Sequence, residues 1–161
     1  MLAETLTAIE ALPVAAALRA GRWSYAAVNG AHVVGIALLF GAIAPLDLRL
    51  MGFWRSIPIR TLKRVLVPVA AAGLVLALAA GMLMFSIRAS EYAAKAVFQF
   101  KLVLIVLAVA NALLLRLAGQ WEASQDVVNL APPMRLRVAG ALSIALWFAV
   151  IACGRSIAFV D

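Results

Sequence analysis

The chain has 161 residues, of which 66% are hydrophobic and 13% are charged, and its formal net charge is +7. A soluble domain of this length encloses too little interior to bury so large an apolar share, which excludes a soluble globular protein. The cations gather at the ends of apolar segments and do not line one face, which excludes a nucleic-acid-binding surface.

The first 23 residues predict a helix that lies along the membrane surface. Leu2, Leu6 and Ile9 recur at helical spacing, while Glu4 and Glu10 fall on other faces. The segment is too polar to span a bilayer and lacks the basic leader of a secretory signal. We therefore assign residues 1–23 to an amphipathic interfacial segment and residues 24–161 to a membrane-spanning bundle.

Four apolar stretches follow, and each is long enough to cross a membrane. A hydrocarbon core of about 30 Å needs about 20 helical residues, and the stretches cover about residues 24–50, 61–87, 94–117 and 134–159. Backbone groups in lipid must be hydrogen-bonded within their own segment, so all four are expected to be α-helices. The predicted fold class is all-α: an integral membrane four-helix bundle with an N-terminal amphipathic interfacial helix.

Small residues recur every four positions in the first two spans. They are Ala31 and Gly35, then Ala37 and Gly41, in the first span, and Gly73, Ala77 and Gly81 in the second. Small side chains at this spacing let two helices approach closely. We therefore expect tight helix–helix contacts along these positions.

The distribution of lysine and arginine predicts how the chain crosses the membrane. Eight cations flank the connections at one end of the bundle, and five flank those at the other. The larger set is Arg49, Arg55, Arg60, Lys63, Arg64, Arg116, Arg135 and Arg137. Positively charged loops favour the cytoplasm, so we expect both termini to be periplasmic in a bacterial inner membrane. The expected partners are the lipid bilayer and either a second copy of the chain or another membrane subunit, with no nucleic acid.

The only histidine of the chain, His32, lies within the first span, about 12 Å from its outer end. Asn29 shares its helical face and Tyr25 lies further outward on a neighbouring line, while Lys101 lies at a similar depth in the third span. Ionisable groups in hydrocarbon are costly and commonly mark functional sites. These four residues are the candidate cofactor-binding set, although Lys101 could simply extend to the outer interface.

Soft ligands occur near the same depth. Imidazole and thioether groups are suitable ligands for Cu(I), so His32, Met82 and Met84 form the candidate metal set. The two methionines lack a diagnostic metal-binding spacing, and methionine is also ordinary apolar filling. The sequence contains no HExxH, phosphate-loop or GxSxG motif, so no catalytic residue is assigned.

A second polar group lies near the cytoplasmic ends of two spans. Asp47 and Arg49 close the first span, and Asn111 lies near the end of the third. We expect these residues to be structural, with Asp47 in an ion pair with a basic side chain. The alternative is a cytoplasmic path for a proton or a ligand.

Several stretches resemble a group of uncharacterised bacterial four-helix membrane proteins. They are HVVGIALLFGAIAPLDLRLMG from His32, GMLMF from Gly81, FQFKLVLIVLAVAN from Phe98 and WFAVIACGR from Trp147. That group is similar to the copper resistance protein D group and, more distantly, to b-type cytochrome bundles. The resemblance implies a haem or copper connection. A chain with one histidine could hold haem b through His32 and a methionine, through His32 alone, or through two copies of His32 in a dimer.

Two functions therefore remain open. The first is a redox or metal-handling membrane protein in which His32 ligates haem b or copper, and Lys101 compensates the charge of a propionate or another anion. We expect such a chain to be an electron-transfer or metal-binding protein and not a hydrolytic enzyme. The second is a non-catalytic accessory or structural subunit of a membrane complex, in which His32, Asn29 and Lys101 form a buried polar network.

Overall fold

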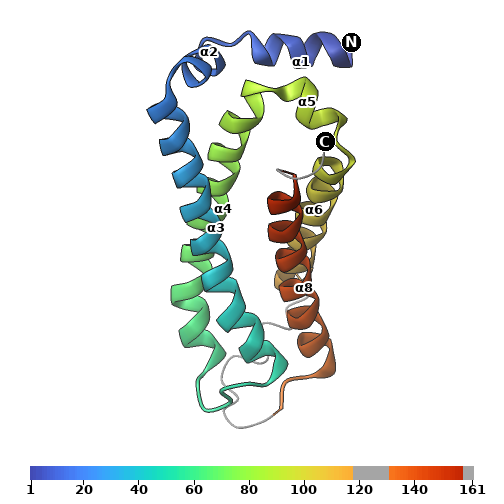
Figure 1. The fold of residues 1–161 in the computed structure, drawn as a ribbon. Coiled ribbons are helices and arrows are strands. Elements are labelled where there is room, and N and C mark those ends of the chain that lie inside the picture. Colours follow the sequence, from blue (N-terminus) through green and yellow to red (C-terminus); the bar gives the residue numbers. More distant parts are fainter. Residues whose placement is uncertain (118–130, 158–161) are drawn as a thin grey trace.

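The structure, a computed structural model, describes residues 1–117 and 131–157, and this part of the chain is helical throughout apart from its connections (Figure 1). The helices are α1 (Leu2–Glu10), α2 (Pro13–Ala20), α3 (Arg22–Met51), α4 (Ile59–Ile87), α5 (Ala89–Ala94), α6 (Ala96–Leu117) and α8 (Met134–Ser156). Four of them, α3, α4, α6 and α8, are long and apolar enough to cross a membrane. The predicted all-α fold is confirmed, and the chain is a multi-pass membrane protein.

The N-terminal segment forms two short helices where we expected one. Pro13 is the first residue of α2, a position at which its missing N–H group costs nothing. Both helices lie across one end of the bundle, where α1 contacts α5 and α2 contacts α4 (Figure 1). We call this end the N-terminal end, and the opposite end, which holds the α3–α4 connection, the basic end.

The spans begin and end close to the predicted residues. The first runs from Arg22 to Met51 and stops where Gly52 adopts a left-handed conformation with φ of 107°. The second ends at Ile87, as predicted. The third starts at Ala96, later than expected, because residues 89–94 form the separate helix α5. The predicted end of the fourth span, residue 159, lies outside the described residues.

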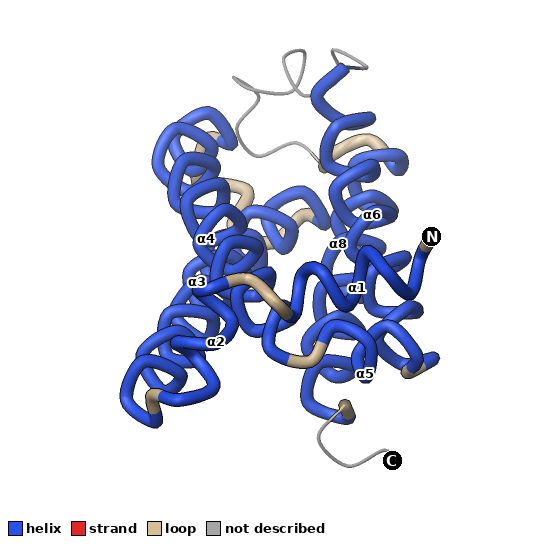
Figure 2. The backbone as a smooth tube through the Cα atoms, turned by 90° about the horizontal axis from the view of Figure 1, so that it is seen from above, coloured by secondary structure: helices blue, strands red, loops and turns tan. Residues whose placement is uncertain are grey.

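The spanning helices pack in the order α4, α3, α8, α6. α3 contacts both α4 and α8, whereas α6 packs mainly on α8. Viewed from the N-terminal end, the α3–α4 pair and the α6–α8 pair stand as two units (Figure 2). The described core between α3, α6 and α8 consists of Leu39, Leu104, Ala108, Trp147 and Val150.

The tightest contact joins α3 to α4 through glycine. A Cβ atom at Gly73 would lie 2.5 Å from the Leu39 backbone nitrogen, and one at Gly35 would lie 2.5 Å from the Ala77 nitrogen. The two backbones therefore touch directly, as the small-residue spacing predicts. The second predicted pair, Ala37 and Gly41, takes no part, because both residues are exposed and a Cβ at Gly41 would meet open space.

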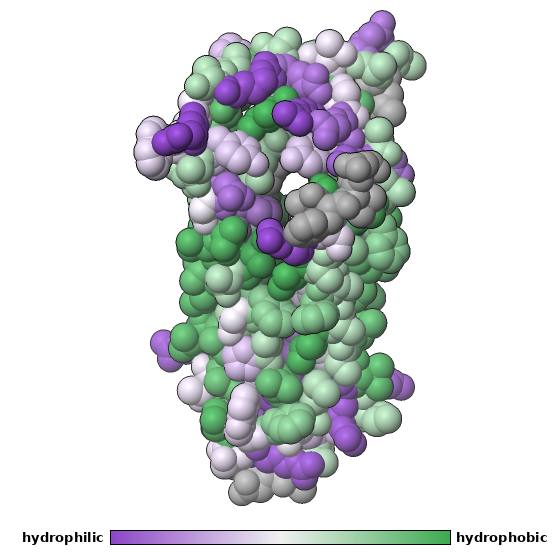
Figure 3. All heavy atoms as spheres, viewed as in Figure 1, coloured by the Kyte–Doolittle hydropathy of each residue, from purple (hydrophilic) through white to green (hydrophobic). Residues whose placement is uncertain are grey.

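The surface agrees with a bilayer environment. On the face shown in Figure 3, hydrophobic residues form a belt across the middle of the molecule, and hydrophilic residues gather towards its two ends. Large apolar side chains such as Val75, Val106 and Phe148 are exposed within this belt. An exposed apolar belt of this kind is costly in water and neutral in lipid, so the bilayer is the partner of this surface.

Candidate functional site

His32 lies at the contact between α3 and α4. Its Nδ1 atom is 2.8 Å from the carbonyl oxygen of Ala77 on α4. A carbonyl oxygen can only accept, so Nδ1 donates the hydrogen, and the lone pair of the neutral ring is on Nε2. A Cβ atom at Gly81 would lie 3.1 Å from Cε1 of the ring. Gly81 therefore leaves the space that the imidazole occupies.

The Nε2 atom of His32 makes no hydrogen bond within the described part of the chain, and it is not among the fully buried polar atoms without a partner. It can therefore still be reached from the space around the ring. Lys101 of α6 is close enough to act on His32 electrostatically. The structure thus brings the two ionisable groups of the predicted site, from different helices, towards one region.

Lys101 directs its ammonium against α8. A Cβ atom at Gly154 would lie 3.2 Å from Nζ, and Cys153 is also within electrostatic range of the ammonium. Gly154 lies near the N-terminal end of the bundle, so the side chain extends in the direction expected for an interfacial lysine while it remains between helices. The contact with Gly154 could not be predicted, because a single glycine in an apolar run has no distinctive pattern.

Asn29 and Tyr25 do not contact His32 through hydrogen bonds in the described structure. Asn29 is exposed, and Tyr25 is 40% exposed. Tyr25 instead lies within electrostatic range of Tyr92 in α5. Burial raises the pKa of the Tyr92 hydroxyl, and the neighbouring Tyr25 and Glu91 act in the same direction.

Three aromatic rings, from α4, α5 and α6, cluster at the N-terminal end of the bundle. The rings of Phe85 and Phe98 are stacked with centroids 5.3 Å apart, and Tyr92 meets Phe98 at 5.9 Å with its ring tilted. Aromatic pairs at such distances contribute about 0.5–1.5 kcal/mol of stability beyond the contribution of the apolar area that they bury. The meeting of these rings could not be predicted from the sequence, since their helices come together only in three dimensions.

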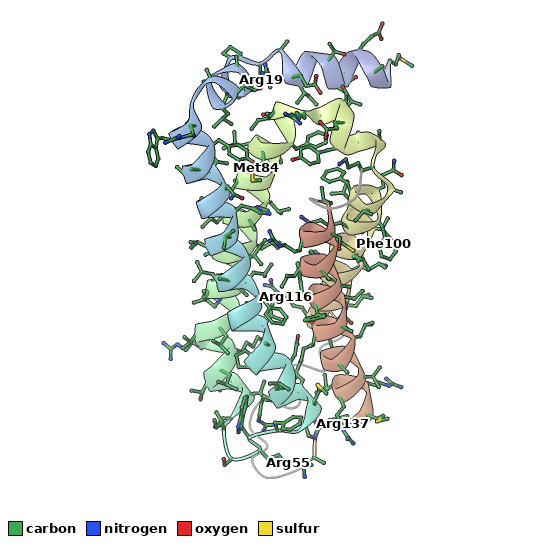
Figure 4. All side chains as sticks on the ribbon, viewed as in Figure 1. Arg19, Arg55, Met84, Phe100, Arg116 and Arg137 are labelled. Atoms are coloured by element: carbon green, nitrogen blue, oxygen red, sulfur yellow. The ribbon has the colours of Figure 1, made fainter. Side chains whose placement is uncertain are left out.

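The two candidate methionines do not act together. Met82 is 66% exposed, whereas Met84 is partly buried. Figure 4 shows Met84 on α4 beneath the N-terminal helices. Residues two apart on a helix point in different directions, so Met82 and Met84 do not both face His32, and a ligand role for either one of them stays a prediction. Within residues 1–117 and 131–157, no group of three or more His, Cys, Asp or Glu side chains could hold a metal.

The second polar group, Asp47, Arg49 and Asn111, makes contacts that hold helices and connections together. The expectation that Asp47 forms an ion pair is wrong. The carboxyl group of Asp47 is hydrogen-bonded to Ser143 of α8, and its Oδ2 atom has no partner in the described structure. Arg49 points elsewhere: its Nε donates to the carbonyl oxygen of Ile57 at 2.7 Å and so ties down the α3–α4 connection. Asn111 Nδ2 donates to the Ala139 oxygen at 3.1 Å and joins α6 to α8.

The N-terminal helices are fastened over the same end as the His32 site. The Oε1 atom of Glu10 accepts the backbone N–H of Ser90, in the first turn of α5, at 2.7 Å. Arg19 donates to the carbonyl oxygens of Ile87 at 3.1 Å and of Glu10 at 2.8 Å. The hydrogen bond from Ser90 lowers the pKa of Glu10, since it favours the carboxylate.

Comparison of the chain with protein families, with curated proteins and with solved structures found no match. The membrane fold and the placement of His32 and Lys101 are therefore the basis for any functional argument.

Proposed function

We propose that the chain is a redox or metal-handling membrane protein in which His32 holds a cofactor, with haem b favoured over copper. The observation that carries the proposal is the hydrogen bond from Nδ1 to the Ala77 carbonyl. Metal-ligating histidines almost always donate their second ring N–H to such an acceptor, because this fixes the ring and makes the other nitrogen more basic. Here it leaves Nε2 as the ligand atom.

Lys101 favours haem over a bare metal ion. Its ammonium acts electrostatically on the region of His32, which opposes a second cation and suits an anion. A haem carries propionate carboxylates, and an ammonium beside one of them would offset its charge in the low-dielectric bundle. The residues that would hold the group are therefore His32 at the iron and Lys101 at a propionate.

The bound haem would supply one-electron transfer, and the chain would supply its position and surroundings. Ala77 fixes the orientation of the His32 ring, and Gly81 keeps room for it. The aromatic cluster of Phe85, Tyr92 and Phe98 lies at the N-terminal end, where α4, α5 and α6 meet. One chain offers one imidazole, so the group would be held by His32 alone, by His32 with a methionine, or by His32 of two copies in a homo-oligomer.

Copper remains the alternative cofactor. Met84 supports it, because this side chain lies one turn beyond Gly81 on α4 and is partly buried. A Cu(I) site would then need a further soft ligand beside His32 and Met84. Cys153, whose thiol lies within electrostatic range of Lys101, is one such group, whereas Met82 is 66% exposed.

The test is an absorption spectrum of the oxidised and reduced protein in mild detergent, with metal analysis of the same sample, after expression with haem precursor and copper supplied. We expect a haem Soret band that His32→Ala removes and Met82→Leu, at an exposed position, leaves unchanged. Lys101→Gln should keep the band but weaken haem retention. A Soret band that survives His32→Ala, or a protein with neither haem nor copper, would overturn the proposal.

A second candidate function is a non-catalytic subunit of a membrane complex. It is supported by two hydrogen bonds that join helices, His32 to Ala77 and Asn111 to Ala139. In this case His32→Asn, which retains a donor near Nδ1, should preserve the thermal stability that His32→Ala loses. If Nε2 instead ligates a cofactor, His32→Asn should lose the cofactor as His32→Ala does, because asparagine would not replace the imidazole.

We further propose that the protein resides in a bacterial inner membrane with both termini in the periplasm. The excess of cations at the basic end supports this orientation. The His32 site would then lie in the periplasmic half of the bilayer. A redox partner or a second copy would reach it from that side or through the membrane.

A further inference from the structure

A shallow groove runs along the outside of the bundle where α3 meets α8, at the basic end. One hollow of about 400 Å³ is lined by residues that include Leu48, Met51, Ala141, Ala145 and Phe148. A second hollow of about 220 Å³ is lined by Met51 and Ala141 again, and by Arg137. Because the two hollows share Met51 and Ala141, they form one continuous groove.

The chemistry of the groove changes along its length. From Phe148 to Ala141 its lining is apolar, and Arg137 adds an exposed guanidinium at the end nearest the start of α8. Figure 4 shows Arg137 near the basic end of the bundle, at the level where the helix leaves the membrane belt of Figure 3. The groove is thus apolar inside the membrane and cationic at its surface.

The length of the groove matches one leaflet of a bilayer. Arg137 and Phe148 are eleven residues apart on α8, or about 16 Å at 1.5 Å per residue. Half of a hydrocarbon core of about 30 Å is about 15 Å. An acyl chain that lies against Phe148, Ala145 and Ala141 would therefore bring its headgroup to the height of Arg137.

We propose that this groove is a binding site for an anionic phospholipid, with one acyl chain along α8 and the phosphate at the guanidinium of Arg137. Charge complementarity identifies the occupant: an apolar groove with one cation at its membrane-surface end matches a fatty chain that ends in an anionic group. The site is independent of His32, which lies towards the opposite end of α3.

The test compares two lipids with identical acyl chains, phosphatidylglycerol and phosphatidylcholine, bound to the full-length protein in mild detergent and counted by native mass spectrometry. Wild type should prefer phosphatidylglycerol, and Arg137→Gln should lower its affinity about fivefold, the effect of one cation near an anionic headgroup. Arg135→Gln is the matched control, because Arg135 is exposed on the same helix but does not line the groove.

A second pair of variants tests the acyl chain. Ala145→Leu places a larger side chain in the groove and should lower the affinity for both lipids, whereas Ala152→Leu, at an exposed position outside it, should not. Equal binding of the two lipids to wild type, equal losses in Arg135→Gln and Arg137→Gln, or an unchanged Ala145→Leu would each overturn the proposal. A dimer that excludes phospholipid would overturn it in favour of a second copy of the chain.

Discussion

At the scale of single residues, the close contact between α3 and α4 depends on glycines, which have no side chain to hold the two backbones apart. Gly73 lies against Leu39 and Gly35 so closely that a Cβ atom would come within 2.8 Å of the Gly35 carbonyl oxygen. Both neighbours are backbone atoms of a helix, which cannot move aside without shifting the whole segment. The same contact sets the position of Ala77, whose carbonyl orients His32.

We predict that Gly73→Ala destabilises the protein by about 1–3 kcal/mol, the cost of overpacking a close contact. Thermal unfolding in one detergent would measure the change. Gly41→Ala is the matched control, because a Cβ atom at Gly41 meets nothing within 4 Å, and it should leave the midpoint unchanged or slightly higher. Equal midpoints for the two variants would show that the helices do not touch at Gly73.

At the scale of helices, the sequence predicted lengths well and directions poorly. Residues 24–50 were expected to span the membrane, and α3 covers Arg22–Met51, because lipid imposes a minimum length of apolar helix. The sequence does not predict which side chains of a span face lipid and which face another helix. Lipid is as apolar as the protein interior, so Met82 could be exposed and Met84 partly buried without any difference in their chemistry.

In the candidate site too, the depth of the residues could be predicted from the sequence and their contacts could not. The depth of His32 and Lys101 followed from counting residues along the spans, and the structure brings the two groups within electrostatic range. Their immediate neighbours could not be predicted. Gly81, Gly154 and the Ala77 carbonyl reach them through the packing of separate helices, which one sequence does not encode in any local pattern.

The attachment of α1 to α5 should depend on pH. The pKa of Glu10 is lowered below its ordinary value, chiefly by the hydrogen bond from the Ser90 backbone. A carboxyl group with a lowered pKa in the folded state contributes stability above its unfolded pKa and loses that contribution as the pH falls through the folded value. The N-terminal helices should therefore loosen in acid.

Hydrogen exchange of α1 and α5 between about pH 6 and about pH 3, corrected for the intrinsic exchange rate, would measure this loosening, which we expect in wild type and in Glu4→Gln. Glu4 is the control because its carboxylate is exposed and pairs with the N-terminal ammonium, whereas that of Glu10 accepts a hydrogen bond from α5. Glu10→Gln should exchange faster near neutral pH and change little with acid. Parallel acid sensitivity in wild type and Glu10→Gln would contradict the assignment to this carboxylate.

At the scale of the whole molecule, the chain is two helical pairs joined along α3 and α8. This arrangement places the connection between α3 and α4 at one end and α5 at the other, with a bilayer-sized apolar belt between them (Figures 1 and 3). Ser56 and Ser90 are exposed in these two places. They therefore report on opposite sides of the membrane.

We predict that a membrane-impermeant thiol reagent applied to intact cells with a permeable outer membrane labels Ser90→Cys but not Ser56→Cys. The expected result follows from the cations at the basic end, which favour the cytoplasm. Both variants are made in a Cys153→Ser background, because Cys153 is the only natural thiol. Opening the inner membrane should expose Ser56→Cys and so prove its reactivity. The reverse pattern would invert the orientation and move His32 to the cytoplasmic half, and labelling of both positions in intact cells would contradict the four-span fold.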